Sequence, residues 1–314
     1  MLTFLIRRAA TLLVTLLVVS VLTFLIPYAG EGDPARKILR ARTNDPALDP
    51  AQVEAMTKEL GLDRPIWAQY FDWLREVVTG NFGYSFTSRT PVHDLVGPAL
   101  GVSMTLALAA LLLALVFALP LGTWAATSPG SKVDNLVTFI SQSAVSAPEY
   151  WVGPVLVLVF ARYLGWLPSG GWNGLTYLIM PAIALALRPL GYFTQVTRAA
   201  MSDVLAAPYI TAARSRGLSF PKTLLRHGMR NSMLPVMTLF SFWFAGLLGG
   251  SVVIEVIFNI PGMGRLLYTS VVNNDVPVIQ GAMLWILTLA VVINTVTDLL
   301  YSVLNPAIRV TSHA

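Results

Sequence analysis

The 314-residue sequence contains no cysteine and only three histidines, His93, His227 and His313. Without thiols the chain cannot form a disulfide, hold an iron–sulfur cluster or use a cysteine nucleophile, and the scattered histidines do not suit a zinc site. We therefore expect no metal site, no bound cofactor and no metal-dependent catalysis.

Charged residues are also scarce, because they make up 12% of the chain, whereas 55% of it is hydrophobic. Soluble globular domains carry about 25% charged residues, so the composition predicts a membrane protein. The formal net charge is +5, but the cations gather in short segments beside apolar runs, where membrane topology accounts for them. No aromatic residues interleave the basic segment, and we expect a lipid bilayer rather than a nucleic acid as the partner.

Six long apolar runs predict transmembrane helices, since about twenty residues cross a hydrocarbon core of ~30 Å. The runs are 9–30, 98–126, 135–163, 175–197, 232–254 and 278–303. Arg7 and Arg8 precede the first run, which predicts a cytoplasmic N-terminus. This run is longer than the apolar part of a signal peptide and no A-x-A site follows, which favours a retained helix over a cleaved one. The predicted fold is an all-α polytopic membrane protein with six crossings and both termini inside.

The runs divide the chain into four parts. Residues 1–30 form the cytoplasmic N-terminus and first span, 31–97 an extracytoplasmic helical segment, 98–304 a five-helix core with a cytoplasmic loop at 198–232, and 305–314 a cytoplasmic tail. In the outer segment Asp49 and Gly61 are placed to begin and end one helix, and a second helix begins near Pro65. Its apolar face should pack on the membrane helices. The segment either covers the outer mouth or docks another protein.

The basic loop reads PYITAARSRGLSFPKTLLRHGMRNSMLP and predicts two short helices that meet at a glycine. Gly217 can take the left-handed conformation that ends the first helix, and Ser219 caps the second. Ala212 and Ala213 would let the first helix approach a groove closely, with Tyr209, Arg214 and Arg216 as anchors, which indicates a docking peg for a partner protein. A cationic patch attracted to anionic lipid is the alternative.

The segment TAARSRGLS, followed by LLRHGMRNSMLP, resembles the EAA loop of the membrane permeases of binding-protein-dependent ABC importers. The similarity points to the dipeptide, oligopeptide and nickel branch. Further segments resemble that branch in the same order along nearly the whole chain: GDPAR, ELGLDRPIWAQYFDWL, GNFGYSF, IFNIPGMGRLL and DLLYSVLNPAIR. Thr211 stands at the Glu position of the EAA motif, and the stretch from Gly217 to Pro235 is longer than in sugar-type permeases. Both departures suit the peptide and nickel branch.

The resemblance implies a type I ABC importer permease in the bacterial cytoplasmic (inner) membrane, which moves di- or oligopeptides into the cytoplasm by alternating access. The implied partners are a second permease subunit, two cytoplasmic ABC ATPases and an extracytoplasmic binding protein. The second permease is usually a different chain in this branch, and pairing with a second copy of this chain is the alternative. Residues 209–218 would be the coupling helix that docks on an ATPase. The residues expected to carry this coupling are Tyr209, Thr211, Ala212, Ala213, Arg214, Arg216, Gly217, Leu218 and Lys222.

The chain has no nucleotide-binding motif of its own, because none of its lysines completes G-x-x-x-x-G-K-[ST]. We therefore expect no catalytic site here, with ATP and Mg on the partner ATPase subunits.

Two charged residues interrupt the predicted third and fourth spans, where an ionisable side chain costs about 2.5–3.5 kcal/mol on insertion scales. On straight helices Glu149 and Arg188 lie at comparable depths, about 21 Å and about 15 Å from the cytoplasmic ends of their spans. We expect them to pair or to line the translocation path. A purely structural ion pair is the alternative.

Two further sites are expected near the membrane surfaces. Asp298, in the last turns of the sixth span, is expected in an interfacial ion pair, with an arginine of the EAA loop as a candidate partner, and a substrate ligand is the alternative. Pro261, Gly262, Met263 and Gly264 form a turn that resembles the family's loop at the outer gate, with a plain connector as the alternative.

Two other functions stay open. Nickel or another small solute could be imported by the same architecture, because selectivity is expected to reside largely in the binding protein. A stand-alone secondary transporter is more distant, since no inverted repeat and no midplane carboxylate beyond Glu149 is evident.

Overall fold

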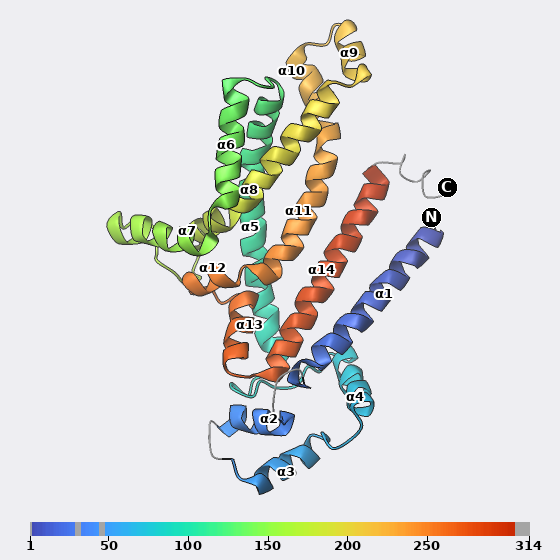
Figure 1. The fold of residues 1–314 in the computed structure, drawn as a ribbon, viewed down its shortest axis with the longest axis vertical. Helices are drawn as coiled ribbons and strands as arrows, with labels where there is room; N and C mark the ends of the chain where they lie inside the picture. Colours follow the sequence, from blue (N-terminus) through green and yellow to red (C-terminus); the bar gives the residue numbers. More distant parts are fainter. Residues whose placement is uncertain (1, 29–32, 44–47, 305–314) are drawn as a thin grey trace. The chain divides into compact units, whose positions relative to one another are not determined.

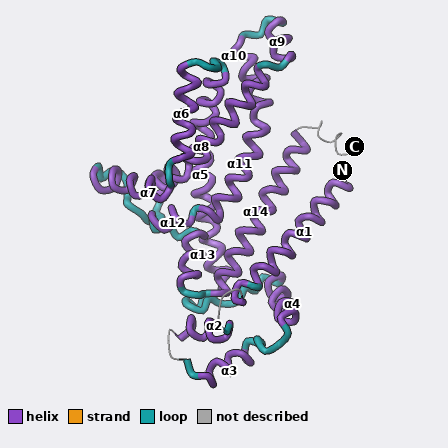
Figure 2. The backbone as a smooth tube through the Cα atoms, viewed as in Figure 1, coloured by secondary structure: helices purple, strands orange, loops and turns teal. Residues whose placement is uncertain are grey.

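The computed structural model describes residues 2–28, 33–43 and 48–304, and most of these are helical. The described residues contain one isolated β-bridge, between Tyr84 and Pro91, and no strand (Figure 2). The predicted all-α class is thus confirmed. The predicted tail at 305–314 lies outside the described residues.

The chain forms two compact units, and each is built from two stretches of sequence. The first unit consists of Met1–Ser103 and Pro261–Val292, and the second of Met104–Ile260 and Ile293–Ala314. The first unit holds α1 (Leu2–Phe24), η1 (Ile26–Tyr28), α2 (Pro34–Thr43), α3 (Pro50–Glu59), α4 (Ile66–Val78), the start of α5 (Val92–Ala126), α13 (Met263–Val272) and most of α14 (Val276–Leu304). The second unit holds the rest of α5 and α14, α6 (Lys132–Ser146), α7 (Glu149–Leu156), η2 (Val157–Tyr163), α8 (Leu175–Leu205), α9 (Pro208–Ser215), α10 (Phe220–Thr223), η3 (Leu224–Met229), α11 (Arg230–Gly250) and α12 (Val252–Ile257) (Figure 1).

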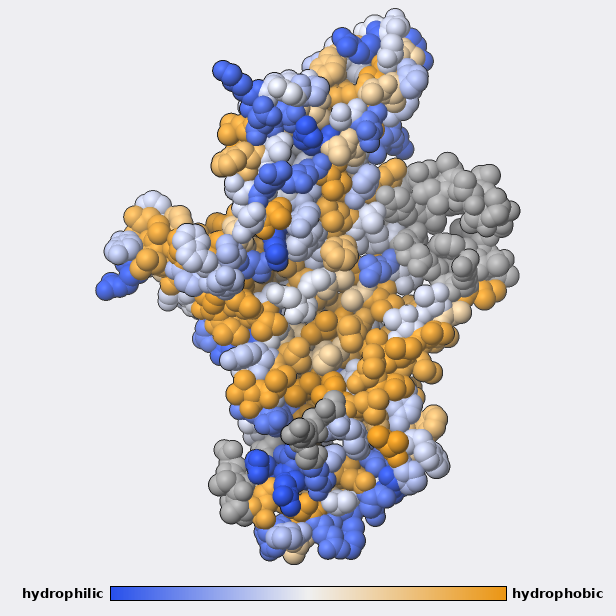
Figure 3. Space-filling view, viewed as in Figure 1, coloured by the Kyte–Doolittle hydropathy of each residue, from blue (hydrophilic) through white to orange (hydrophobic). Residues whose placement is uncertain are grey.

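Five helical stretches are long and apolar enough to cross a membrane, and a bent pair brings the number to six. The five are Ala9–Tyr28, Val92–Ala126, Leu175–Leu205, Phe220–Gly250 and Val276–Thr297. Exposed leucines along the first of them, such as Leu13 and Leu17, suit a lipid-facing surface. In Figure 3 hydrophobic side chains cover much of the middle of the view, whereas the end of the second unit that carries α9 and α10 shows many hydrophilic ones.

The third predicted span is not a straight helix. Lys132–Ser146 and Glu149–Tyr163 meet at an angle of 94° (Figure 1). Proline disfavours the helical conformation of the residue before it, and Ala147 is accordingly extended, with φ −67° and ψ 120°, ahead of Pro148. The second half of this stretch then continues as α7 and the π-helical η2.

The extracytoplasmic helices of the first unit form a small core of their own. α2, which the sequence reading did not predict, packs on α3 through Ala35, Ile38, Leu39, Val53 and Met56. As predicted, Asp49 caps α3, because its side chain accepts a hydrogen bond from the Ala51 amide at 3.0 Å. Gly61 follows with a positive φ of 62°.

The predicted packing of α4 on a membrane helix is confirmed within the first unit. The Tyr70 hydroxyl lies 2.8 Å from that of Ser20 on α1. The ring of Phe24, at the end of α1, contacts both Tyr70 and Trp73 on α4. Aromatic contacts of this kind add about 0.5–1.5 kcal/mol each beyond burial, so α4 is fixed against the outer end of α1.

In the second unit α8 lies between α6 and α11 and packs on both (Figure 1). Glycine residues allow α8 to approach both α6 and α5 closely. A Cβ atom at Gly191 would lie 2.4 Å from the Ser141 carbonyl oxygen on α6, and a Cβ atom at Gly122 on α5 would lie 2.6 Å from the Thr194 carbonyl oxygen. Small residues allow membrane helices to approach this closely.

Candidate functional site: the α9 loop and the charged residues of the helical core

The basic loop begins with a short helix, α9, whose end follows from the predicted glycine. Gly217 has φ 89°, a left-handed conformation that glycine adopts without strain. The Gly217 amide donates to the Arg214 carbonyl at 2.9 Å, and the Leu218 amide donates to the Ala213 carbonyl at 3.3 Å. These two bonds form a Schellman motif, which satisfies carbonyl groups at the end of α9. The prediction that this helix stops at Gly217 is confirmed.

The two faces of α9 differ in exposure. Ile210 and Ala213, three residues apart, point inward and are 4% and 0% exposed. The expectation that Ala213 lies on the contact surface is therefore wrong: an inward-facing methyl is what the packing of this short helix on its own unit requires. Leu218 is half-buried, and the other predicted coupling residues are exposed: Tyr209, Thr211, Ala212, Arg214, Arg216, Gly217 and Lys222.

Two contacts fix the exposed anchors of α9. The Asn231 side-chain amide on α11 donates to the Tyr209 hydroxyl at 3.1 Å. The Arg214 guanidinium lies 5.6 Å from the centre of the Phe220 ring, within the range of a cation–π interaction. The outer face of α9 is therefore held in one orientation relative to α10 and α11.

The second half of the loop is not a separate short helix. Phe220–Gly250 forms one long helical stretch, in which α10 passes through the π-helical η3 directly into α11. Ser219 occupies the N-cap position with extended backbone angles, but its side chain makes no capping hydrogen bond. Pro221 lies in the first turn, where its missing N–H does no harm, and the helix continues through Gly228 and Pro235 as far as Gly250.

An ion pair that the sequence reading missed holds the start of the loop. Asp134 on α6 is 3% exposed and receives two hydrogen bonds from Arg198 on α8, one of them at 2.8 Å from Nη2. The Gly130 amide donates to the same carboxylate at 2.9 Å. Such bidentate pairs restrict geometry as well as adding energy. The spacing of Ser131 and Asp134 is typical of a helix start, yet no local signal connects Asp134 to a residue 64 positions away.

The two charged residues inside the predicted spans lie close together. Arg188 Nη1 is 4.0 Å from Glu149 Oε1, and the two side chains are 52% and 21% exposed. The straight-helix depth estimate for Glu149 is wrong, because this residue begins α7 after the bend. The pair is therefore located where the helix direction changes.

The predicted outer-gate residues belong to the first unit. The Met263 amide donates to Ser103 Oγ at 2.7 Å, and its side chain lies in a core cluster with Val92 and Val278. Gly262 precedes α13, so Met263 and Gly264 begin a helix and only Pro261 and Gly262 belong to the turn. The side chain of Asp298 lies outside the described residues.

Two buried carboxylates also escaped the sequence reading. Glu255 on α12 is fully buried and accepts a hydrogen bond from Ser251 Oγ at 2.7 Å. Asp275, before α14, is 3% exposed and accepts from the Ser85 hydroxyl and from the amides of Phe86 and Thr87. Among the described residues no group of three or more acidic or histidine side chains is arranged to hold a metal ion.

Comparisons with known proteins match this architecture. Residues 118–310 match the family described as the binding-protein-dependent transport system inner membrane component, and residues 1–109 match the family of its N-terminal region. The glutathione transport system permease protein GsiC of Escherichia coli (strain K12) is 38% identical over 309 residues, covering 98% of this chain and 99% of that protein. GsiC of Shigella dysenteriae serotype 1 (strain Sd197) gives the same identity and coverage.

Among solved structures, the MetNI methionine ABC transporter in inward facing conformations is similar, with a TM-score of 0.53 and 16% identity. The match covers 67% of this chain and 96% of that one, and it supports the fold. In this family the nucleotide is bound and hydrolysed by separate ATPase chains, so the chain described here has no catalytic site of its own. The chain therefore belongs to the family of inner membrane components of binding-protein-dependent transport systems, as a permease subunit of an ABC importer.

Proposed function

We propose that this permease subunit imports short peptides, which an extracytoplasmic binding protein delivers. The observation that carries the proposal is the similarity over nearly the full length of both chains to a permease named for glutathione, which is itself a tripeptide. The peptide branch was also indicated by segments such as GDPAR and IFNIPGMGRLL. Import of nickel or another small solute by the same architecture is the alternative.

The exposed face of α9 is proposed as the contact with a cytoplasmic ATPase. Tyr209, Thr211, Ala212, Arg214 and Arg216 supply its outward side chains, Gly217 ends the helix, and Lys222 extends the basic surface onto α10. Leu218 lies half-buried at the same end. Ala213 is proposed only to support this surface from beneath. A cationic patch for lipid would not need the Schellman stop or the Tyr209 tether, which favours a protein partner.

The pair Glu149 and Arg188 is proposed to line the translocation path, and Pro261–Gly264 to lie at the outer gate. The side chain of Arg188 is 52% exposed in the single chain, which leaves it accessible to a solute or to a neighbouring subunit. For that neighbour we propose a second, different permease subunit. The two permeases would present two α9 helices to two ATPases, and nucleotide binding would favour one of two orientations of the spans.

The test is ATP hydrolysis by the assembled importer in lipid nanodiscs, with its binding protein loaded with Ala-Phe-Ala, with glutathione or with Ni²⁺. Stimulation by either peptide and not by Ni²⁺ would support the proposal, whereas stimulation by Ni²⁺ alone would favour the alternative. The coupling surface is tested by Ala212→Trp, which should abolish the stimulation and reduce ATPase subunits that co-purify. Ser128→Trp, at an exposed position between α5 and α6, is the matched control and should leave both unchanged.

A further inference from the structure

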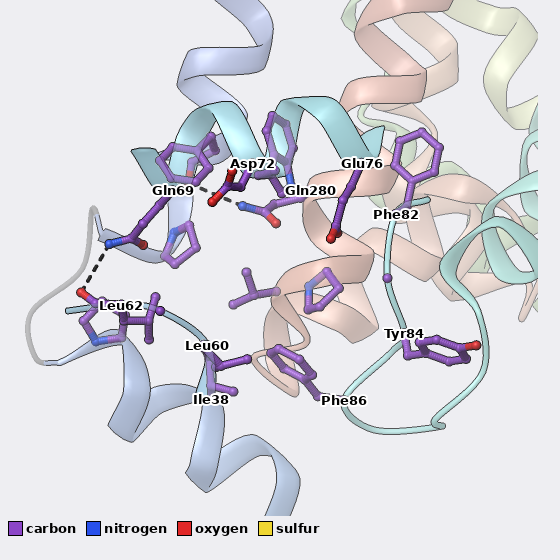
Figure 4. A pocket seen from close by; sticks show the side chains of 18 of the residues that line it. Ile38, Leu60, Leu62, Gln69, Asp72, Glu76, Phe82, Tyr84, Phe86 and Gln280 are labelled. Carbon is purple, nitrogen blue, oxygen red and sulfur yellow. Dashed lines mark hydrogen bonds between the residues drawn. The ribbon is translucent and has the colours of Figure 1, made fainter. Parts of the chain in front are cut away.

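The extracytoplasmic part of the first unit contains a cavity of about 750 Å³ (Figure 4). Its walls come from the end of α1 and η1, from α2, from the turn between α3 and α4, from α4, from the loop at 81–89 and from the start of α14. Sites for small molecules typically measure about 300–1,000 Å³. The cavity is therefore large enough for a small ligand, and it contains none of the residues assigned above to coupling, translocation or the outer gate.

Aromatic rings make up much of the cavity wall. The ring of Phe24 contacts those of Tyr28 and Trp73, and Phe82 and Phe86 come from the loop at 81–89. Tyr84, from the same loop, is 63% exposed, so this part of the wall is in contact with solvent. The π-faces of such rings attract organic cations and pack against apolar groups.

Two charged side chains of the cavity have no partner within the described part of the chain. The carboxylate of Glu76 points from α4 into the cavity in Figure 4, and it makes no hydrogen bond or ion pair there. Arg89, the last residue of the loop at 81–89, likewise has no side-chain partner among the described residues. By contrast, Arg64 donates to Asp72 at 2.6 Å, so these two charges offset each other.

The remaining polar groups of the wall are engaged in holding it together. The Gln280 side-chain amide lies 3.4 Å from the carbonyl oxygens of Thr23 and Phe24. The Gln69 amide donates to the Leu62 and Arg64 carbonyls at 3.2 Å and 2.8 Å. Glu59 also lines the cavity and has an interaction partner. The unmatched charges are therefore one carboxylate and one guanidinium.

A ligand that suits this lining carries an ammonium group, a carboxylate and an apolar side chain. We propose that the cavity binds a short peptide with free termini on the extracytoplasmic side, with its α-ammonium on Glu76 and its α-carboxylate on Arg89. Charge-assisted hydrogen bonds of this kind are roughly twice as strong as neutral ones, and a guanidinium matches the shape of a carboxylate. This inference rests on the proposed peptide specificity and adds a second place where the substrate contacts the permease.

A lysine of the docked binding protein could present the same ammonium chemistry. A concave site lined on several sides suits a small molecule better than a protein surface, which buries a broad and flatter area. The cavity is therefore assigned to the peptide itself, and a contact with the binding protein is one outcome that would overturn this assignment.

The experiment is equilibrium dialysis of radiolabelled Ala-Phe-Ala against the assembled importer in nanodiscs, without binding protein. For wild type, Nα-acetylation of the peptide should weaken binding about tenfold or more, which corresponds to about 1.4 kcal/mol. Glu76→Gln should weaken binding of the free peptide by a similar factor and should remove the effect of acetylation. Arg89→Gln should likewise remove the effect of C-terminal amidation.

Glu54→Gln is the matched control. Glu54 lies outside the cavity on α3, and its hydrogen bond with Lys58 lowers the pKa of its carboxyl. Glu54 is therefore charged in the wild type, and the substitution removes one negative charge, as Glu76→Gln does. This variant should bind all three peptides like wild type. Elution of each complex as a single species checks that the variants assemble.

Several results would overturn the inference. The first is that the peptide does not bind to the wild-type importer. The second is that acetylation weakens peptide binding equally in wild type and in Glu76→Gln. The third is that Glu76→Gln lowers only the affinity of the importer for the binding protein. ATPase stimulation by the peptide-loaded binding protein is measured on the same preparations. Intact stimulation without direct peptide binding refutes the cavity site alone, whereas loss of stimulation by any peptide refutes the proposed function.

Discussion

At the scale of single residues, the buried carboxylates hold loops in place. Asp275 accepts hydrogen bonds from the Ser85 hydroxyl and from the amides of Phe86 and Thr87, and in this way it fixes the loop that carries Phe82, Tyr84 and Phe86. An amide side chain at this position has one accepting atom and one donating group, so it cannot accept all three bonds.

We predict that Asp275→Asn destabilises this loop by about 1–3 kcal/mol, the usual cost of leaving buried donors unpaired. Hydrogen exchange of the Phe86 and Thr87 amides should become correspondingly faster. Asp94→Asn, at an exposed position near the start of α5, should leave these amides protected. Equal protection in both variants would show that Asp275 does not hold the loop.

A second residue-scale prediction concerns Glu149 and Arg188, whose side chains approach to 4.0 Å. Glu149→Arg and Arg188→Glu each place two like charges at this separation and should reduce peptide uptake severely. If the two residues act as a pair, the double variant should recover most of the activity, because it restores opposite charges. A double variant worse than either single one would indicate separate contacts with the substrate.

At the scale of helices, the sequence predicted those features that depend on neighbouring residues. The N-cap Asp49 and the stop at Gly217 follow from residues within one turn of each helix end. Pro148 marks where the third span breaks, but a proline does not fix the angle between the two halves, which packing decides.

Contacts between segments far apart in the chain could not be predicted from the sequence. Arg198 stands at the start of the basic loop, and it binds a carboxylate 64 residues earlier in the chain. Asp275 binds a loop 190 residues away, and α2 depends on apolar contacts with α3. No periodicity or motif records such pairings, so they became evident only from the fold.

The close approach of α6 and α8 leads to a prediction at this scale. Gly191→Ala would place a methyl group 2.4 Å from the Ser141 carbonyl oxygen, so the helices must move apart, at a typical cost of 1–3 kcal/mol. The unfolding temperature of the purified complex, followed by fluorescence-detected size exclusion, should fall. Gly246→Ala on α11 is the control, since a Cβ atom there meets no atom within 4 Å, and it should be neutral or slightly stabilising.

At the scale of the whole molecule, the absence of cysteine makes the topology directly testable. Single cysteines at the exposed positions Ser88, Ser169 and Ser215 report on the outer segment, the loop after the bent pair and α9. In the six-span arrangement Ser88→Cys and Ser169→Cys react with an impermeant maleimide added outside intact cells, and Ser215→Cys reacts only after permeabilisation. Protection of Ser169→Cys from outside would mean that the bent pair does not cross the membrane.

The unbroken helical stretch from Phe220 to Gly250 has a mechanical consequence. A force applied to α9 first crosses the turn at 216–219 and then enters a single helical stretch of 31 residues, Phe220–Gly250. Along this stretch, the wide turn Leu224–Met229 and Pro235 are the places where helical hydrogen bonding departs from its regular pattern, and such places bend most easily. In the coupling proposed above, the share of an ATPase movement that reaches the membrane-spanning part of α11 would depend on the stiffness of these few residues.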